Sequence, residues 1–207
     1  CGHDSHIAIL MGTAEILARH RNEIEGNVKF IFQPAEEGVF GEGIEFGADL
    51  MVKEGVLKNP DVAAIFGLHI NSQTPTGQIL YRSGATMAAV DQFYITVKGK
   101  QTHGAYPWSG IDPILTASQI VQGLNTIVSR NVVLTDNPAV VSIGSIHGGN
   151  RHNIIPEEVK MIGTIRTLDV EQRKMVHERI KTIATKIAES NDAEAEVLIE
   201  NGYPVTA

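Results

Sequence analysis

Between residues 92 and 200 the spacing of the apolar residues changes in a fixed order, and this order strongly constrains the fold. Phe93, Ile95 and Val97 alternate with polar side chains, which is the period of a strand with one buried face. The six predicted elements are a strand at 92–98, a helix from Pro113, strands at 139–147 and 159–166, a helix at 170–188 and a strand at 194–200. Strand-helix-strand-strand-helix-strand is the order of a ferredoxin-like α+β unit.

The residues before this unit have a different pattern. Asp4 and Ser5 favour a helix start, and the apolar residues that follow lie on one stripe at helical spacing. Two continuous apolar segments, 28–32 and 62–69, flank a helix predicted at 47–57. Strand, helix and strand with unbroken apolar strands indicate a parallel α/β sheet. We therefore expect two domains that meet near residues 78–84.

Composition excludes several classes of protein. Apolar residues make up 43% of the 207 residues, enough for a real core, but no stretch approaches the roughly 20 apolar residues of a membrane helix. The formal charge of −7 argues against a nucleic-acid or membrane partner. The single cysteine suits a reducing compartment, so we expect a cytoplasmic protein. Because the chain begins at Cys1 and not at Met, we expect a piece of a longer protein.

Metal-binding side chains occur at three places in the first 70 residues. Cys1 and His3 stand two residues apart ahead of a helix, and thiolate and imidazole both bind zinc and neighbouring metals. Glu36 and Glu37 directly follow one predicted strand, and His69 ends the next. Ligands gather at the carboxyl ends of strands in open α/β sheets. One carboxylate there can bind a metal while its neighbour acts as a base.

These residues lie in motifs that resemble one family. The motifs are CGHDSH, QPAEEG, GLH, HGAYP followed by IDP, and NIIP. Together they resemble the aminoacylase/carboxypeptidase family of co-catalytic metallohydrolases, peptidase family M-twenty. The similar branch contains hippurate hydrolases, indole-acetyl-amino-acid hydrolases, N-acyl-diaminopimelate deacetylases and N-acyl-L-amino acid amidohydrolases. The resemblance covers essentially the whole chain.

The resemblance implies a two-metal site and a hydrolytic reaction. Cys1, His3, Glu37 and His69 match the ligands of two divalent ions, which could be zinc, manganese, nickel or cobalt. Glu36 matches the general base that takes a proton from metal-activated water. The implied reaction cleaves the amide bond of an N-acyl amino acid, hippurate-like or N-acetylated, or of a small peptide. Asp4 is either a group that supports the ligands or a simple helix cap.

The resemblance also assigns roles in the second domain. His103 matches a residue that stabilises the oxyanion in the partner subunit's active site, so the protein is expected to be a homodimer. The alternative is a loop histidine beside Gly104 and Pro107. Asn153 and Arg166 match substrate-binding groups, and a guanidinium suits a free carboxylate. Trp108 either lines the substrate entrance or packs on its neighbours.

The implied architecture is a partial zinc-peptidase-like α/β catalytic domain at 1–80 and a ferredoxin-like βαββαβ dimerisation or lid domain at 81–201. Residues 202–207 would begin the return to the catalytic domain. Family members have further catalytic sequence before and after these residues, including one more histidine ligand. By itself the first domain would expose unpaired strand edges and apolar faces. Two alternatives are an inactive fragment whose intact domain serves dimerisation, and a silent relative that only binds substrate.

Overall fold

The computed structural model describes residues 2–37 and 47–206, and the chain divides into two compact units. One unit is Cys1–Ile79 and the other is Leu80–Ala207, and each is described by itself. Within the described ranges, no helix is both long enough and apolar enough to span a bilayer.

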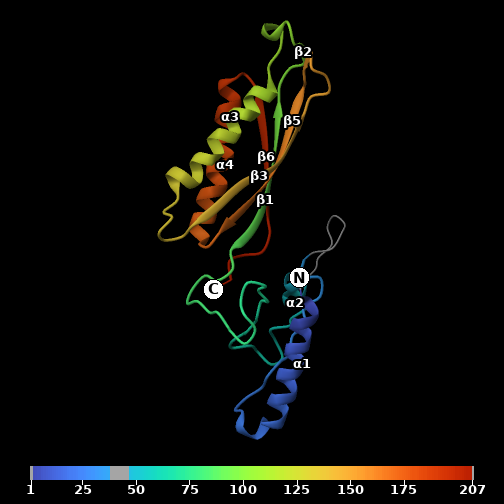
Figure 1. Cartoon of the computed structure of the whole chain (residues 1–207), viewed down its shortest axis with the longest axis vertical. Helices are drawn as coiled ribbons and strands as arrows, with labels where there is room; N and C mark the ends of the chain where they lie inside the picture. The colour runs from blue at the N-terminus through green and yellow to red at the C-terminus, as the bar shows by residue number, and fades with distance from the viewer. Residues whose placement is uncertain (1, 38–46, 207) are drawn as a thin grey trace. The chain divides into compact units, whose positions relative to one another are not determined.

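The unit Leu80–Ala207 is built on a four-stranded sheet with the order β3-β5-β1-β6, in which all neighbours are antiparallel (Figure 1). Its main elements are β1 (Ala89–Lys98), α3 (Pro113–Thr126) continued by η3 (Ile127–Asn131), β3 (Ala139–Gly148), β5 (Glu158–Thr167), α4 (Val170–Ser190) and β6 (Glu194–Asn201). The helices α3 and α4 pack side by side on one face of the sheet. The predicted ferredoxin-like βαββαβ unit is confirmed.

The core of this unit lies between the sheet and the two helices. Phe93, Ile95 and Val97 of β1 are fully buried, as their alternation with polar residues predicts. The helices contribute their own apolar faces to the same cluster, chiefly Ile120 and Leu124 from α3 and Val176 and Ile180 from α4. Burying each such side chain stabilises the fold by about 1.5–3 kcal/mol. This apolar cluster makes the unit a rigid support for the loops at its ends.

Two aspartates fix the starts of the helices. The side chain of Asp112 accepts hydrogen bonds from the N–H groups of Ile114 and Leu115, at 2.8 and 3.1 Å. Pro113 takes the first helical position, where its missing N–H is not needed. Asp169 caps α4 by accepting from the N–H of Gln172 at 2.7 Å. Both helices therefore begin at residues set by local sequence.

A buried ion cluster joins β1 to α4 at the end of the sheet where the chain enters and leaves the unit. The Asp91 carboxylate, 1% exposed as a residue, accepts hydrogen bonds from Nε and Nη2 of Arg173 and pairs with Nε2 of His177 at 2.8 Å. The N–H of Gly202 donates to the same carboxylate at 3.1 Å. Burial raises the pKa of Asp91, but these hydrogen bonds outweigh it and hold the pKa below its usual value.

A short two-stranded ribbon lies at the other end of the same unit. It pairs β2 (Thr102–His103) with β4 (Ile154–Ile155), in antiparallel register. The 3-10 turn η2 (Pro107–Ser109) follows β2 before the chain returns to α3. The ribbon therefore carries His103, and Asn153 just before β4, at the end of the sheet (Figure 1).

The described part of the unit Cys1–Ile79 contains α1 (His3–Arg19), η1 (Arg21–Glu23) and α2 (Gly47–Lys53). The first predicted helix forms, but Asp4 is not its cap. Gly2 occupies the cap position with φ of 82°, no side chain caps the helix, and Asp4 lies inside the first turn. The second helix is shorter than predicted, because Gly55 has φ of 87°, a left-handed conformation that ends helices.

The two strands predicted at 28–32 and 62–69 do not form, and neither is buried. Neither segment pairs with another strand among the described residues, so neither forms the hydrogen bonds of a β-sheet. The side chain of Lys29 instead holds the first segment, donating to the carbonyls of Val56 and Lys58 at 2.9 and 2.7 Å. Phe66 is 94% exposed. Other apolar side chains of these segments are also exposed, among them Phe32 and Ile65.

Candidate active site

Three of the predicted metal-site residues lie together in the unit Cys1–Ile79. His3 is the first residue of α1, and its Nε2 lies 3.2 Å from a Glu37 carboxylate oxygen and 3.6 Å from a Glu36 carboxylate oxygen. Ala35, with φ of 48°, turns the chain immediately before the two acids. The structure thus brings residues 3, 36 and 37 together across more than thirty residues of sequence.

The donor atoms of this cluster suit a divalent metal ion. One imidazole nitrogen and two carboxylate oxygens all lie within 4.8 Å of one another. Zinc and neighbouring ions bind these ligand types. All three side chains are more than half exposed, so the cluster is open to water and to a ligand. Cys1, the predicted thiolate ligand, lies outside the described residues.

His69 is not part of the described three-residue cluster, but one nitrogen of its ring is hydrogen-bonded to the backbone. Nδ1 of His69 lies 2.7 Å from the carbonyl oxygen of Ile70. A carbonyl only accepts hydrogen bonds, so Nδ1 carries a proton, and in the neutral ring Nε2 then carries the lone pair. A backbone carbonyl bonded to one ring nitrogen in this way is typical of metal-binding histidines.

The sequence reasoning missed the role of His6. Its Nε2 accepts a hydrogen bond from the backbone N–H of Ile70 at 3.3 Å, and its ring meets that of His69 edge to face at 5.8 Å. His6 therefore positions the segment that carries His69. The signal in the sequence is the spacing of His3 and His6, because residues three apart lie on the same face of a helix.

In the second unit the ribbon β2–β4 places His103 next to Asn153. The N–H of Gly104 donates to the carbonyl of Asn153 at 2.7 Å, and His103 pairs with Ile154 in the ladder. The N–H of Ala105 donates to Nδ1 of His103 at 3.0 Å. In the neutral ring Nδ1 is then the acceptor, which leaves Nε2–H as a hydrogen-bond donor. A fixed N–H donor is what oxyanion stabilisation requires.

Arg166 lies far from His103 and Asn153 within this unit. It occupies the end of β5 opposite to β4, about eight residues beyond Glu158, or roughly 26 Å at about 3.3 Å per residue. Its Nη1 donates to Thr164 Oγ1 and, at 2.9 Å, to the carbonyl of Ile165. One copy of the unit therefore does not bring Arg166 and His103 to a common substrate.

Comparison with known proteins places the chain in a family. The peptidase dimerisation domain of the M20 family matches residues 89–192, which is half of the chain and includes both helices and strands β1, β3 and β5 of the ferredoxin-like unit. The chain belongs to the M20 peptidase family, as its motifs predicted.

Individual relatives extend the similarity over both units. The N-acetylcysteine deacetylase of Bacillus subtilis is 44% identical over 95% of this chain and 49% of its own length. Thermostable carboxypeptidase 2 of Saccharolobus solfataricus is 40% identical over the whole chain and 51% of its own length. The chain thus spans about half the length of these curated relatives.

A solved structure is also similar to this chain. The Bacillus subtilis YXEP protein, described as a dinuclear metal-binding peptidase of the M20 family, matches with a TM-score of 0.79 and 40% identity. The match covers 99% of this chain and 49% of that protein. The relatives named here therefore include a deacetylase and peptidases, all of which act on amide bonds.

Proposed function

We propose that this chain contributes metal ligands, a general base and a dimerisation domain to a metal-dependent hydrolase that cleaves the amide bond of N-acyl amino acids. The observation that carries the proposal is the cluster of His3, Glu36 and Glu37. A related deacetylase and a related carboxypeptidase both have substrates with an amide bond, which supports the reaction class.

The proposed ligands are Cys1, His3, Glu37 and His69, and the proposed cofactor is a pair of divalent ions such as zinc, manganese, nickel or cobalt. When bound, such ions supply a Lewis acid that polarises a carbonyl group and acidifies water. Glu36, next to the ligand Glu37, would take a proton from the water molecule that attacks the amide carbonyl. It would then deliver this proton to the leaving amine.

The second unit would provide groups that act on the substrate. His103 would donate Nε2–H to the oxygen of the scissile carbonyl as negative charge develops there. Asn153, on the same ribbon, would bind the substrate beside it, and Arg166 would bind a free carboxylate. The separation of Arg166 from His103 within one unit supports an arrangement in which these two residues serve different active sites of a homodimer.

The sheet edges indicate which side of the domain would pair in that homodimer. β3 and β6 are the two edge strands. β6 carries Glu194, Glu196 and Glu200, whereas β3 contains no acidic residue, lysine or arginine. Charged side chains protect an edge from pairing, and paired β6 strands would bring carboxylates together. A second copy would therefore pair along β3.

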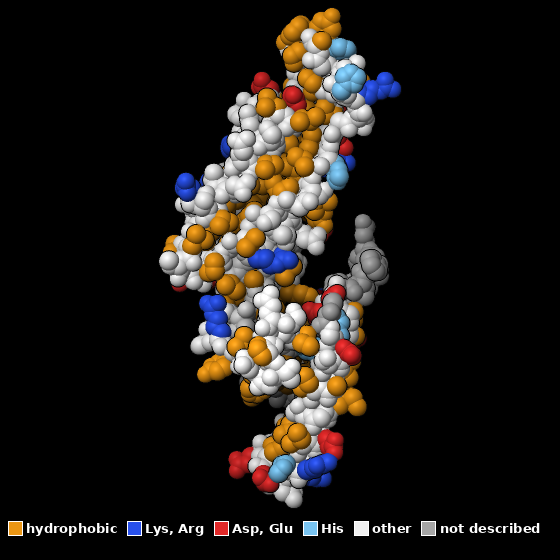
Figure 2. Space-filling view, in the orientation of Figure 1, with side chains coloured by type: hydrophobic (Ala, Val, Ile, Leu, Met, Phe, Trp, Pro, Cys, Tyr) orange, Lys and Arg blue, Asp and Glu red, His pale blue; other side chains and the backbone are white. Residues whose placement is uncertain are grey.

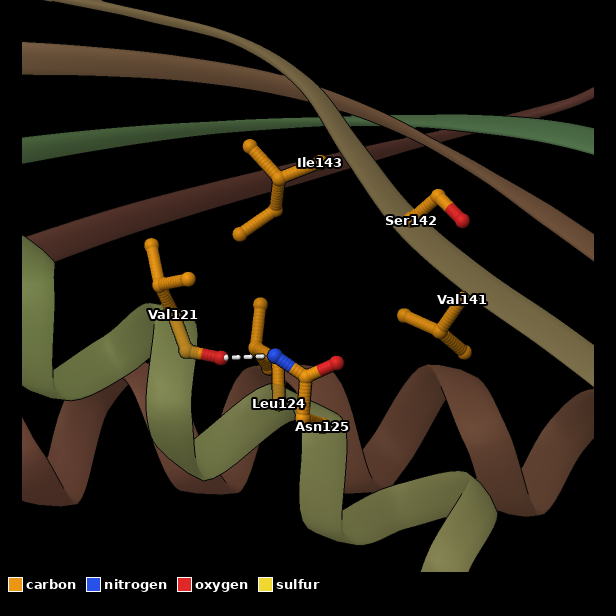
Figure 3. Close-up of a pocket in the computed structure, with 6 residues that line it drawn as sticks. All are labelled: Val121, Leu124, Asn125, Val141, Ser142 and Ile143. Carbon is orange, nitrogen blue, oxygen red and sulfur yellow. Dashed lines mark hydrogen bonds between the residues drawn. The ribbon is translucent and has the colours of Figure 1, made fainter.

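A groove beside β3 also supports β3 as the strand that pairs in the dimer. It lies between α3 and β3, has a volume of about 220 Å³ and is bordered mainly by aliphatic side chains (Figure 3). Its lining residues are Val121, Leu124, Asn125, Val141, Ser142 and Ile143. Asn125 is the main polar group, and its Nδ2 already donates to the carbonyl of Val121 at 2.8 Å. Apolar side chains from a second copy would fill this groove.

The experiment that tests the proposal is an assay of the full-length protein, loaded in turn with each candidate metal, against a panel of N-acyl amino acids. Metal content is measured in parallel by mass spectrometry. Hydrolysis that disappears with a chelator and returns with metal supports the enzyme. A protein that dimerises but takes up no metal would instead be a dimerisation module, and the proposal would be wrong.

A further inference from the structure

Two exposed aromatic side chains stand beside His103 on the ribbon end of the second unit. Tyr106 and Trp108 meet edge to face, with ring centroids 5.5 Å apart, and the Tyr106 ring lies 5.7 Å from the ring of His103. Tyr106 is 55% exposed and Trp108 is 76% exposed. Large aromatic rings that contribute little to a core are typical of binding surfaces.

Backbone hydrogen bonds hold this segment in one shape. The N–H of Tyr106 donates to the carbonyl of His103 at 2.8 Å, and the N–H of Ser109 donates to the carbonyl of Tyr106 at 3.1 Å. Lys100 and Ile111 close the base of the loop with two hydrogen bonds of 2.9 and 3.0 Å. The aromatic pair is therefore preorganised, so that a ligand binds without first ordering the loop.

The charge of this end of the unit suits an anionic ligand. Neither residues 103–109 nor residues 149–153 contain an acidic side chain, although the whole chain has a formal charge of −7. Arg151 and His152 are both exposed on the second of these segments. Figure 2 shows apolar, histidine and basic side chains gathered at this end. An N-acyl amino acid carries a carboxylate and would not be repelled here.

We propose that Tyr106 and Trp108 bind the acyl group of the substrate and favour large apolar acyl groups over acetyl. This inference rests on the proposed function, in which His103 donates to the scissile carbonyl oxygen. The scissile carbonyl belongs to the acyl group, and its substituent is bonded directly to the carbonyl carbon, so this substituent lies within a few bonds of the oxygen that His103 contacts. The Tyr106 ring is adjacent to His103, and the ring of Trp108 extends the apolar surface outward.

The test compares two substrates that share one amino acid, N-benzoylglycine and N-acetylglycine, in the full-length metal-loaded protein. Tyr106→Ala and Trp108→Ala are each expected to lower kcat/KM for the benzoyl substrate by about 10-fold or more, and to leave the acetyl substrate within about 2-fold. Trp108→Phe keeps an aromatic face and should retain most of the preference. Leu198→Ala is the control, because Leu198 is 58% exposed on β6, outside the ribbon.

The outcomes separate this inference from the proposed function. If both substrates lose activity equally in the alanine variants, or if neither does, the acyl assignment is overturned while the hydrolase stands. If the wild-type protein hydrolyses no N-acyl amino acid with any candidate metal, the proposed function fails and the acyl assignment fails with it. A selective loss on the benzoyl substrate, with recovery in Trp108→Phe, supports the assignment.

Discussion

The N–H of Ala105 donates a hydrogen bond of 3.0 Å to Nδ1 of His103, and this contact determines which ring nitrogen of the neutral histidine carries the proton. Nε2–H is left as the donor for a ligand. In His69 the corresponding nitrogen has the opposite role, because Nδ1 donates a hydrogen bond to the carbonyl of Ile70. The two ring orientations therefore suit the different roles proposed for these residues, His103 as a hydrogen-bond donor and His69 as a metal ligand.

The first prediction concerns the donor role of His103. His103→Ala should lower kcat by about 10²- to 10³-fold, the usual effect of removing an oxyanion donor, while metal content stays unchanged. His103→Gln should retain more activity than His103→Asn, because only the longer amide places an N–H near the position of Nε2. Steady-state kinetics and metal analysis check this. Equal loss of activity and metal would point to a structural role.

The second prediction separates Glu36 from Glu37, which are adjacent in sequence and both lie near His3. Glu36→Gln should keep its metal yet lose at least about 10²-fold in kcat, because an amide cannot accept the proton. Glu37→Gln should lose metal, because a carboxylate ligand is removed. The two variants serve as controls for each other. Unimpaired hydrolysis by Glu36→Gln would sink the role of base assigned to that residue.

The third prediction concerns the edge that pairs in a dimer. Val141→Lys on β3 should convert the full-length protein to monomers, because a buried ammonium in the groove has no carboxylate partner there. Val197→Lys is the matched control, since Val197 packs in the same way on the opposite edge strand β6. Light scattering after size-exclusion chromatography gives the mass. A monomer in the Val197 variant alone would show that β6 is the interface.

The fourth prediction follows from the pKa of Asp91. Asp91→Asn should destabilise the second unit by about 3–5 kcal/mol at pH 7, because it removes the charge of a buried carboxylate and leaves the partly buried Arg173 without its charged partner. The pKa of Asp91 is depressed in the folded state, so its stabilisation is present above the unfolded value of 3.8 and is lost as pH falls through the folded pKa.

Hydrogen exchange of amides in β1 and α4 measures this difference as a function of pH. The difference in the free energy of unfolding between the wild type and Asp91→Asn should be constant near neutrality and should become smaller below pH 3.8. A gap that widens as the pH falls would contradict the direction of the pKa shift.

The fifth prediction concerns Gly163, which faces Phe93 across β5 and β1. A Cβ at Gly163 would lie 2.1 Å from the Phe93 ring and 2.5 Å from the carbonyl oxygen of Ser142. Gly163→Ala should therefore destabilise the unit by about 1–3 kcal/mol. Gly144→Ala on the neighbouring strand β3 is the control, because its Cβ would meet nothing closer than 4.0 Å. Similar rates of amide hydrogen exchange in both variants would show that the sheet adjusts to the added methyl group without loss of stability.

Much of the second unit could be predicted from sequence because its signals are local. The alternation around Phe93 and the proline at position 113 each depend only on neighbouring residues. The helix begins at Pro113 as predicted, and the strand ends at Lys98 as predicted but begins three residues earlier, at Ala89. The order of these elements then leaves few topologies. The motifs likewise predicted the M20 family, which the match to residues 89–192 confirms.

The first unit was less predictable because a strand depends on its partner. Segments 28–32 and 62–69 have the apolar composition of buried strands, yet the described residues provide no ladder for them and their side chains are exposed. Asp4 looked like a helix cap, but α1 begins one residue earlier at His3. Apolar composition indicates a preference for the strand conformation, but a strand forms only where a neighbouring strand provides hydrogen-bonding partners.

The sequence by itself determined the ferredoxin-like order, the family, and the residue types available for metal binding and proton transfer. Only the tertiary structure decided which of them meet: His3 with Glu36 and Glu37, His6 with the segment of His69, and His103 with Asn153, while Arg166 lies at the far end of β5. It also decided that Nδ1 is the ring nitrogen that meets the backbone in both His69 and His103. The physical reason is that proximity and hydrogen-bond direction depend on how distant segments pack, which no local pattern encodes.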